Sequence, residues 1–398
     1  MLRHRNIAVF SDDWGRHPSS CQHLIKQLLP HNQVLWVNTI GMRSPQFSAS
    51  DVKRSLEIMR GWLKKSDKLA GKALPDNLTI ISPVMIPYNN VPGVRTLNRY
   101  LVKKALGRVV VEKGMKDLVV MTTFPCTCDY VGDLQESLYV YYCVDDFVNW
   151  PGVNLHLIKS MEEKLLDRCD LVMATAEELG KAKTRGTKPV HLLLHGVDFS
   201  RFNVTVDRSL IPQAMKGIAS PIIGFFGALS SWLDFDLLAS IAKERPDWSF
   251  VFIGPVDTDI SSIRTIPNVH LVGRVDYELL PLYAACFDVG IIPFKVNELT
   301  KSVNPLKLLE YLSVGIPVVS TFMPEVLKYS DVVRIAHDKQ EFLQALNQSL
   351  QDTSQERRQA RIEKARAHSW QSVAEHFSQL IVEAEQAKSA LQPIGPVV

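Results

Sequence analysis

Two series of short, uninterrupted apolar segments alternate with longer amphipathic segments over almost all of the 398-residue chain. Apolar runs without polar alternation are typical of strands buried on both faces of a parallel sheet, and the intervening helical segments supply the crossovers. The sequence therefore predicts an α/β protein with two doubly wound, Rossmann-like domains. The expected strands are residues 6–10, 33–38, 78–82, 118–122, 138–144, 171–175 and 190–196 in the first series, and 222–227, 249–254, 269–273, 289–294 and 317–321 in the second.

The domain boundary is expected near residues 203–220, a mostly polar stretch with Pro212 in it and Pro221 directly after it. This predicts an N-terminal domain of residues 1–205 and a C-terminal domain of residues 218–369. The segment that follows, 370–388, places Trp370, Val373, Phe377, Leu380, Ile381 and Ala384 on one helical face. Such a face needs a packing partner, and the C-terminal domain is already complete without it.

The apolar runs are far shorter than the 18 or more residues that span a bilayer. The first apolar run, 6–10, is followed by two aspartates, so we interpret it as a first strand and not as a signal peptide. The six cysteines are scattered without a CxxC pair, which favours reduced core thiols in a cytoplasmic protein.

Positive charge is concentrated in residues 51–116, which hold 14 basic and 5 acidic residues, a net charge of +9. Residues 52–65 would form a helix whose apolar face is surrounded by lysines and arginines, and residues 94–114 would form a second basic helix. Such helices are typical of an anionic membrane surface, although a core-facing helix with a solvated charged side has the same pattern. A polyanionic acceptor would be a further partner, whereas nucleic acid is disfavoured because the basic residues lack interleaved stacking aromatics.

The most informative segment is SVNPLKLLEYLSVGIPVVST, residues 302–321. Asn304 is expected to cap a helix that begins at Pro305 and ends at Gly315. A helix N-terminus carries free N–H groups and partial positive charge, so it can hold a diphosphate, with Lys307 reaching the same phosphates. Glu310 lies on the same face, where its carboxylate could accept hydrogen bonds from ribose hydroxyls. The alternative is an ordinary solvated ion pair between Lys307 and Glu310.

Together with residues 224–242, 250–255 and 269–294, this segment resembles the nucleotide-sugar-binding domain of GT-B glycosyltransferases. The likeness is to the family 1 and family 4-like group that acts in bacterial surface polysaccharide and teichuronic-type polymer assembly. It implies two Rossmann-like domains facing a cleft, with the last helix crossing back to the N-terminal domain. The resemblance also implies that a nucleotide-diphosphate sugar is the donor and that no metal and no other cofactor is required.

The resemblance assigns donor-binding roles to particular residues. Gly227 would approach the donor phosphates, Gly254 and Gly273 would lie near the base, and Asn304, Lys307 and Glu310 would contact the nucleotide. Ser302 stands where retaining family 4 enzymes carry a glutamate. Because some inverting exopolysaccharide glucuronosyltransferases show a similar departure, retaining and inverting transfer both stay open.

A second candidate site follows the apolar run 138–144, where Asp145 and Asp146 would lie at the carboxyl end of a buried strand. Inverting transfer needs a general base for the acceptor hydroxyl, and neighbouring carboxylates can raise one another's pKa toward that role. Asp145 is the first choice as base and Asp146 the second. A helix cap followed by a solvated loop is the alternative.

Three further segments contain residues of the kinds found in binding sites. Gly15, Arg16 and His17 form a strand-to-helix turn that could bind the acceptor, and either Ser19 or Ser20 would cap the helix that follows. His195 belongs to a segment similar to the hinge strand of these enzymes, where it would line the cleft or serve a structural role. Asp257 and Asp259 spell a DxD sequence, but their polar loop after a strand favours a solvated position.

These expectations combine into a glycosyltransferase that moves a hexosyl or glucuronosyl group from a nucleotide sugar to a lipid-linked or polysaccharide acceptor. The expected location is the cytoplasm, with peripheral contact to the inner face of the plasma membrane. A GT-B-fold nucleotide-sugar epimerase and a non-catalytic nucleotide-sugar-binding protein are the alternatives. An NAD dehydrogenase is disfavoured because no GxGxxG follows any of the expected strands.

Overall fold

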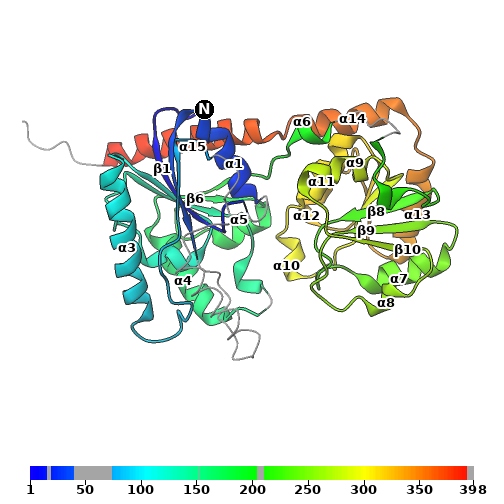
Figure 1. The fold of residues 1–398 in the computed structure, drawn as a ribbon, viewed down its shortest axis with the longest axis horizontal. Helices are drawn as coiled ribbons and strands as arrows, with labels where there is room; N and C mark the ends of the chain where they lie inside the picture. Colours follow the sequence, from blue (N-terminus) through cyan, green and yellow to red (C-terminus); the bar gives the residue numbers. More distant parts are fainter. Residues whose placement is uncertain (16–18, 40–73, 151, 204–209, 392–398) are drawn as a thin grey trace, which may run out of the picture. The chain divides into compact units, whose positions relative to one another are not determined.

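The computed structural model describes residues 1–15, 19–39, 74–150, 152–203 and 210–391. The chain divides into two compact units, Met1–Leu193 with Ala374–Val398, and Leu194–Val373 (Figure 1). The division falls before the polar stretch 203–220 to which the sequence pointed. The reason is that Val197 and Phe202 are buried in the hydrophobic core of the second unit, so the chain enters that unit ahead of the polar stretch.

The first unit is built on a parallel sheet of seven strands in the order β3-β2-β1-β4-β5-β6-β7. The crossovers run in opposite directions on either side of β1, which places the topological switch point between β1 and β4, where open α/β sheets bind ligands. The strands are β1 (Asn6–Ser11), β2 (Gln33–Asn38), β3 (Leu78–Ile81), β4 (Val119–Thr122), β5 (Leu138–Cys143), β6 (Leu171–Ala174) and β7 (Val190–Leu192).

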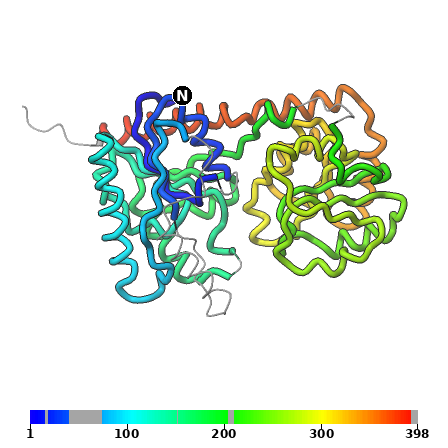
Figure 2. Tube along the Cα trace, viewed as in Figure 1, coloured from blue at the N-terminus to red at the C-terminus, as the bar shows by residue number. Residues whose placement is uncertain are grey.

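Helices flank this sheet. The C-terminal helix α15 (Trp370–Leu391) returns to the first unit and contacts residues that precede β1 and β6 (Figure 2). The Leu2 N–H donates to the Ser378 hydroxyl at 2.9 Å, and Lys388 bonds to Asp170 at 2.9 Å. The return of the last helix to the N-terminal half is thereby confirmed. The other helices of this unit are α1 (Ser20–Leu28), α3 (Val94–Glu112), α4 (Leu155–Arg168) and α5 (Glu177–Lys183), with 3₁₀ turns η1 (Leu29–His31), η3 (Pro125–Asp129) and η4 (Phe147–Asn149).

The second unit repeats the plan with a six-stranded parallel sheet in the order β10-β9-β8-β11-β12-β13. Its switch point lies between β8 and β11. The strands are β8 (Ile222–Phe226), β9 (Ser249–Ile253), β10 (Val269–Gly273), β11 (Val289–Ile292), β12 (Val318–Thr321) and β13 (Arg334–Ala336).

The helices of the second unit include several single turns close to the strand ends. They are α6 (Phe199–Phe202), α7 (Phe235–Glu244), α8 (Ser261–Arg264), α9 (Leu280–Ala284), α10 (Glu298–Lys301), α11 (Leu306–Val314), α12 (Pro324–Leu327), α13 (Lys339–Leu350) and α14 (Gln355–Arg366), with 3₁₀ turns η6 (Gln213–Met215) and η7 (Tyr277–Leu279).

The two doubly wound sheets confirm the predicted fold class, and all twelve expected strands are present. Strand β13 was not expected from the sequence, because this edge strand has three residues and two of them are only half-buried. All six cysteine thiols are free, and only Cys286 is not fully buried. Within the described ranges, no helix has the length and apolar character that crossing a bilayer requires.

Candidate functional site

Three glycines stand side by side where β8, β9 and β10 end. The Gly227 N–H donates to Ile253 O at 2.8 Å, and the Gly254 N–H donates to Gly273 O at 2.8 Å. A Cβ on Gly254 would lie 2.0 Å from the carbonyl oxygen of Gly227, so no larger residue fits there without a backbone shift. The three residues therefore form a tightly packed backbone rim at the carboxyl edge of the sheet, where ligands of this fold bind.

Helix α11 is seated on this rim by Tyr311. The Tyr311 hydroxyl accepts a hydrogen bond from the Phe226 N–H at 3.1 Å, and its ring meets the Phe226 ring edge-on at 4.8 Å between centroids. On β11, a Cβ at Gly290 would lie 2.9 Å from the Tyr311 ring, so glycine makes room for this contact. Because Tyr311 bridges β8 and β11, α11 is fixed at the topological switch point.

The first turn of α11 is where the sequence analysis expected a phosphate cradle. The helix begins at Leu306, its N-cap is Pro305, and no side chain caps it, so the expectation that Asn304 is the N-cap was wrong. Pro305 has an extended conformation, which delays the helix start by one residue. Asn304 is buried in the link from α10, and Ser302 lies half-buried in the same link. Gly315 ends the helix in the left-handed conformation, as predicted.

Lys307 points from this first turn toward the glycine rim. A Cβ on Gly227 would lie 2.1 Å from Lys307 Cε and 2.7 Å from Nζ, so the lysine occupies the space that the glycine leaves. The ammonium group also lies 5.6 Å from the centre of the Phe225 ring. Burial lowers the pKa of Lys307, while the carboxylate of Glu310 opposes that effect. A cation and a helix N-terminus thus face the backbone at the end of β8, an arrangement suited to a diphosphate.

Glu310 lies one turn further along α11 and is buried. Burial raises its pKa to about 7, and Lys307 and a hydrogen bond from the Tyr277 hydroxyl counteract the rise. Tyr277 is itself held between the Arg201 guanidinium, 5.7 Å from its ring centre, and the edge of Phe202. The carboxylate is therefore fixed in direction and close to its charge transition at neutral pH.

The segment that leads into α6 holds Asp198 and His195. Asp198 accepts a hydrogen bond from Arg201 Nε at 2.8 Å, and its charge acts on Glu310. His195 is buried, burial lowers its pKa to about 4, and its Nδ1 has no hydrogen-bond partner among the described residues. Gly196 packs against Trp370, whose Cα would be 3.0 Å from a Cβ at that position.

In the first unit, Asp145 and Asp146 have different surroundings although they are adjacent. Burial raises the pKa of Asp145 to about 6, against the effect of hydrogen bonds from the Asp146 N–H and the Trp150 side chain. Asp146 is more deeply buried and pairs with Lys183 Nζ at 3.2 Å. Asp146 thus belongs to an internal ion pair, and Asp145 is the half-buried carboxylate of the two.

The turn between β1 and α1 is organised by Asp12. Its carboxylate accepts hydrogen bonds from the Ser19 hydroxyl at 3.0 Å and from Gln22 at 3.2 Å, and Ser19 is the N-cap of α1. Gly15 adopts a left-handed conformation, and its N–H donates to Gln22 Oε1. Arg16 and His17, the other expected acceptor residues of this turn, lie outside the described residues.

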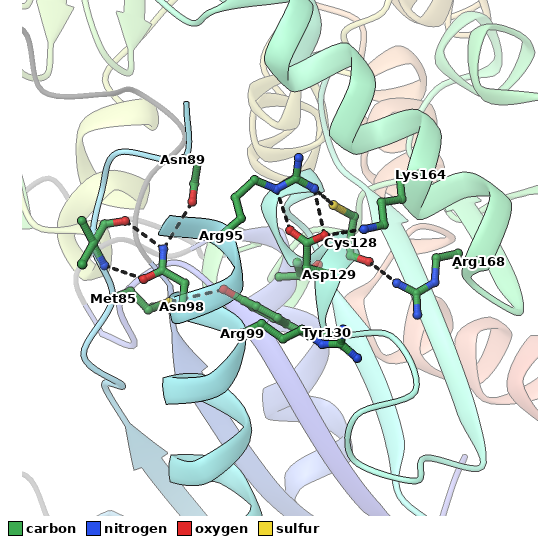
Figure 3. A network of polar contacts seen from close by, with 12 residues as sticks. Met85, Asn89, Arg95, Asn98, Arg99, Cys128, Asp129, Tyr130, Lys164 and Arg168 are labelled. Carbon is green, nitrogen blue, oxygen red and sulfur yellow. Dashed lines mark hydrogen bonds and ion pairs between the residues drawn. The ribbon is translucent and has the colours of Figure 1, made fainter. Parts of the chain in front are cut away.

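Part of the basic region can be located on α3. Arg95 forms a bidentate pair with Asp129, which also binds Lys164 (Figure 3). Arg99 pairs with Asp133. These two arginines therefore attach α3 to the rest of the unit. The other expected basic helix, at 52–65, lies outside the described residues.

The exposed face of α3 combines apolar and basic side chains. Leu97, Tyr100 and Val111 are 44%, 60% and 81% exposed, and Lys104 and Arg108 lie between them at helical spacing. We call these five residues the α3 face. Asp257 and Asp259, in contrast, are simply exposed, and Asp259 accepts hydrogen bonds from Ser261.

Tyr277 and Lys183 were not identified from the sequence. Tyr277 donates a hydrogen bond to Glu310, and Lys183 pairs with Asp146. Tyr277 could have been suspected, because it is a polar aromatic residue shortly after the strand that ends at Gly273. Lys183 gave no signal, since an isolated lysine near a helix end normally faces solvent.

One family model and one curated relative each match part of the chain. Residues 220–352 match the family model described as glycosyl transferases group 1. Over 183 residues the chain is 33% identical to the putative teichuronic acid biosynthesis glycosyltransferase TuaH of Bacillus subtilis. That match spans 43% of this chain and 45% of TuaH, so it covers less than half of either protein.

Solved structures resemble the whole chain at low sequence identity. Sucrose-phosphate synthase of Thermosynechococcus elongatus has a TM-score of 0.70 at 14% identity, covering 96% of this chain and all of that structure. Anabaena HepE in complex with UDP-glucose has a TM-score of 0.61 at 14% identity, covering 98% of this chain and 100% of that one. These likenesses show the fold, which is GT-B.

Proposed function

We propose, from the membership of residues 220–352 in the glycosyl transferases group 1 family, that this chain transfers a sugar from a nucleotide-diphosphate sugar to a hydroxyl acceptor. The observation that carries the proposal is the packing of Lys307 against Gly227 at the first turn of α11. A diphosphate there would receive hydrogen bonds from backbone N–H groups and charge from the lysine. Glu310, one turn away, would accept hydrogen bonds from the ribose hydroxyls.

The donor diphosphate is proposed to bind without metal or other cofactor, because the helix N-terminus and Lys307 supply positive charge where the leaving group forms. Asn304, Ser302, Gly254 and Gly273 belong to the same proposed donor site. UDP is the proposed nucleotide, supported by the UDP and UDP-glucose bound to HepE. The sugar is proposed to be a hexosyl or glucuronosyl group.

The acceptor is proposed to be a lipid-linked or polysaccharide intermediate of bacterial envelope synthesis, which the likeness to a teichuronic acid glycosyltransferase supports. Asp145 is the proposed general base for the acceptor hydroxyl. Its raised pKa suits a group that must take up a proton near neutral pH. We also propose a cytoplasmic location with the α3 face against anionic lipid, because its apolar and basic side chains match that surface.

A donor screen tests the proposal directly. Nucleoside diphosphates and their sugars are added in EDTA, and thermal unfolding is followed; at 100 times the dissociation constant, binding adds about 2.7 kcal/mol of stability. The stabilising donor is then incubated with and without acceptor fractions, and the products are separated by chromatography. Sugar transfer only with acceptor supports the proposal. Conversion of the sugar without acceptor identifies an epimerase, and binding without any conversion identifies a non-catalytic binding protein.

A further inference from the structure

A buried cluster of charges lies directly behind the proposed base. Lys183, the last residue of α5, is 5% exposed in its side chain, and its Nζ lies 3.2 Å from Asp146 Oδ1 and 2.8 Å from Glu162 Oε2. The side chains of Asp146 and Glu162 are also almost fully buried. One lysine therefore serves two carboxylates from two different elements inside the first unit.

The remaining oxygens of both carboxylates are also satisfied. The Tyr141 hydroxyl donates to Glu162 Oε1 at 2.7 Å, and Asn149 Nδ2 donates to Asp146 Oδ2 at 2.6 Å. Burying three charges is costly, and a well-packed apolar replacement is often at least as stable. Stability alone is therefore a poor explanation for this cluster, whereas the fixed orientation of its groups is a direct consequence of it.

That orientation reaches Asp145 through the backbone. The Asp146 N–H donates to Asp145 Oδ1 at 2.8 Å, and the Trp150 side chain donates to the same carboxylate group. We infer that Lys183 is a positioning residue for Asp145: by anchoring and neutralising Asp146, it fixes the turn after β5 and sets the charge that the proposed base faces. The inference rests on the proposed function for the catalytic meaning of Asp145.

The charges around Asp145 give the direction of each effect. Among the described residues, the titratable groups that bear on Asp145 are Asp146 beside it and Lys183 from α5, while Glu162 from α4 and Cys143 from β5 lie behind them. The negative charge of Asp146 favours protonation of Asp145, and the positive charge of Lys183 opposes it. Removing the charge of Asp146 should therefore lower the pKa of Asp145, and removing the charge of Lys183 should raise it.

Carboxyl NMR of protein labelled with 13C at the aspartate γ-carbon measures this titration without any substrate. Asp145→Asn identifies the signal. We expect the titration midpoint of Asp145 to fall by about 1 pH unit in Asp146→Asn and to rise by about 1 pH unit in Lys183→Met. Lys181→Met removes an exposed lysine of the same helix and is the matched control, with no change expected.

The Asp146→Asn variant keeps the pair between Lys183 and Glu162, so it decides the question if Lys183→Met does not fold. An unmoved midpoint in Asp146→Asn, or shifts of the same sign in both variants, would overturn the inference. Opposite shifts in a protein that transfers no sugar would support the network while the proposed function fails. Transfer activity with an unmoved midpoint would overturn the network alone.

Discussion

Lys307 and Glu310 are neighbours on one helix face, yet their surroundings suit different parts of a nucleotide. Lys307 lies against the backbone of Gly227, whereas Glu310 is fixed by Tyr277. The two side chains therefore have different partners. The solvated ion pair considered from the sequence does not describe them, because Glu310 is buried and Lys307 is half-buried.

Replacing these residues should change binding of different ligands. Lys307→Ala should weaken UDP about 10- to 100-fold, since a charged hydrogen bond contributes about 1.5–3 kcal/mol, and should leave uridine binding nearly unchanged. Glu310→Ala should weaken both ligands. Calorimetry measures all four affinities, and Lys301→Ala, an exposed lysine of α10, is the control. Wild-type affinities in both variants would show that this helix is structural.

Glu310 should also make nucleotide binding depend on pH. Its pKa is about 7 in the free protein, and ribose hydroxyls donate best to the ionised form, so UDP affinity should rise as pH increases from 6 to 8. Binding should release a proton, which calorimetry detects in buffers of different ionisation enthalpy. Glu310→Gln should lose the part of this dependence that comes from the carboxylate, while the titration of the diphosphate stays the same. Equal pH dependence in both proteins would contradict the prediction.

Replacing Asp145 should lower the turnover rate without changing the affinity for the donor. Asp145→Asn should reduce turnover roughly 10²–10⁴-fold, because the amide cannot take the proton of the acceptor hydroxyl. UDP affinity should stay at the wild-type value, since the residues proposed to bind the donor all belong to the second unit. Steady-state rates and calorimetry on the same preparation test both statements. Full turnover in the variant would mean that another group is the base or that transfer is retaining.

At the scale of elements, the ends of β8, β9 and β10 and the start of α11 together form the proposed donor site. Tyr311 holds α11 on β8 and β11, and two arginines of α14 bind the other end of α11: Arg358 donates to Val314 O at 3.1 Å and Arg361 to Gly315 O at 3.0 Å. Positive charge at a helix C-terminus is stabilising. The first turn of α11 is therefore left for a ligand while the rest of the helix is fixed.

Gly227→Ala tests this arrangement. Its Cβ would displace the Lys307 side chain, and its φ of +140° is strained for alanine. We expect a loss of roughly 1–3 kcal/mol in unfolding free energy and more than about tenfold weaker UDP binding. Gly217→Ala also places alanine at a positive φ, of +85°, but no atom lies within 4 Å of its Cβ. That control should lose stability and keep its affinity; an equal loss of affinity in both would show that the Lys307 contact is unimportant.

At the scale of the whole molecule, the exposed apolar and basic side chains of the α3 face lead us to predict binding to anionic membranes. Lys104→Glu combined with Arg108→Glu should reduce binding to phosphatidylserine vesicles at least tenfold, since each basic residue near an anionic surface contributes about 1 kcal/mol. Transfer to a short water-soluble acceptor should be unaffected. Lys243→Glu, an exposed lysine of the second unit, is the control in vesicle sedimentation. Wild-type protein that does not bind such vesicles would refute the membrane proposal.

The order of nearly every strand could be read from the sequence, because a strand buried on both faces requires an uninterrupted apolar run whatever surrounds it. Residues 222–227 gave such an apolar run, and residues 302–321 added a proline at the helix start and a glycine at its end. Three-residue β13 had no such signal. The start of α11 was also misplaced by one residue, since Pro305 can stand at the cap or in the first turn.

The sequence by itself determined the two doubly wound units, the α11 segment as the donor-site candidate, and the choice of Asp145 and Asp146. Only the tertiary structure decided what those residues face. Tyr277 meets Glu310, and Lys183 meets Asp146, across separations in the chain that no local pattern encodes. The physical reason is that a side chain's charge and pKa depend on burial and on partners from other elements, and these exist only once the sheets and helices have packed.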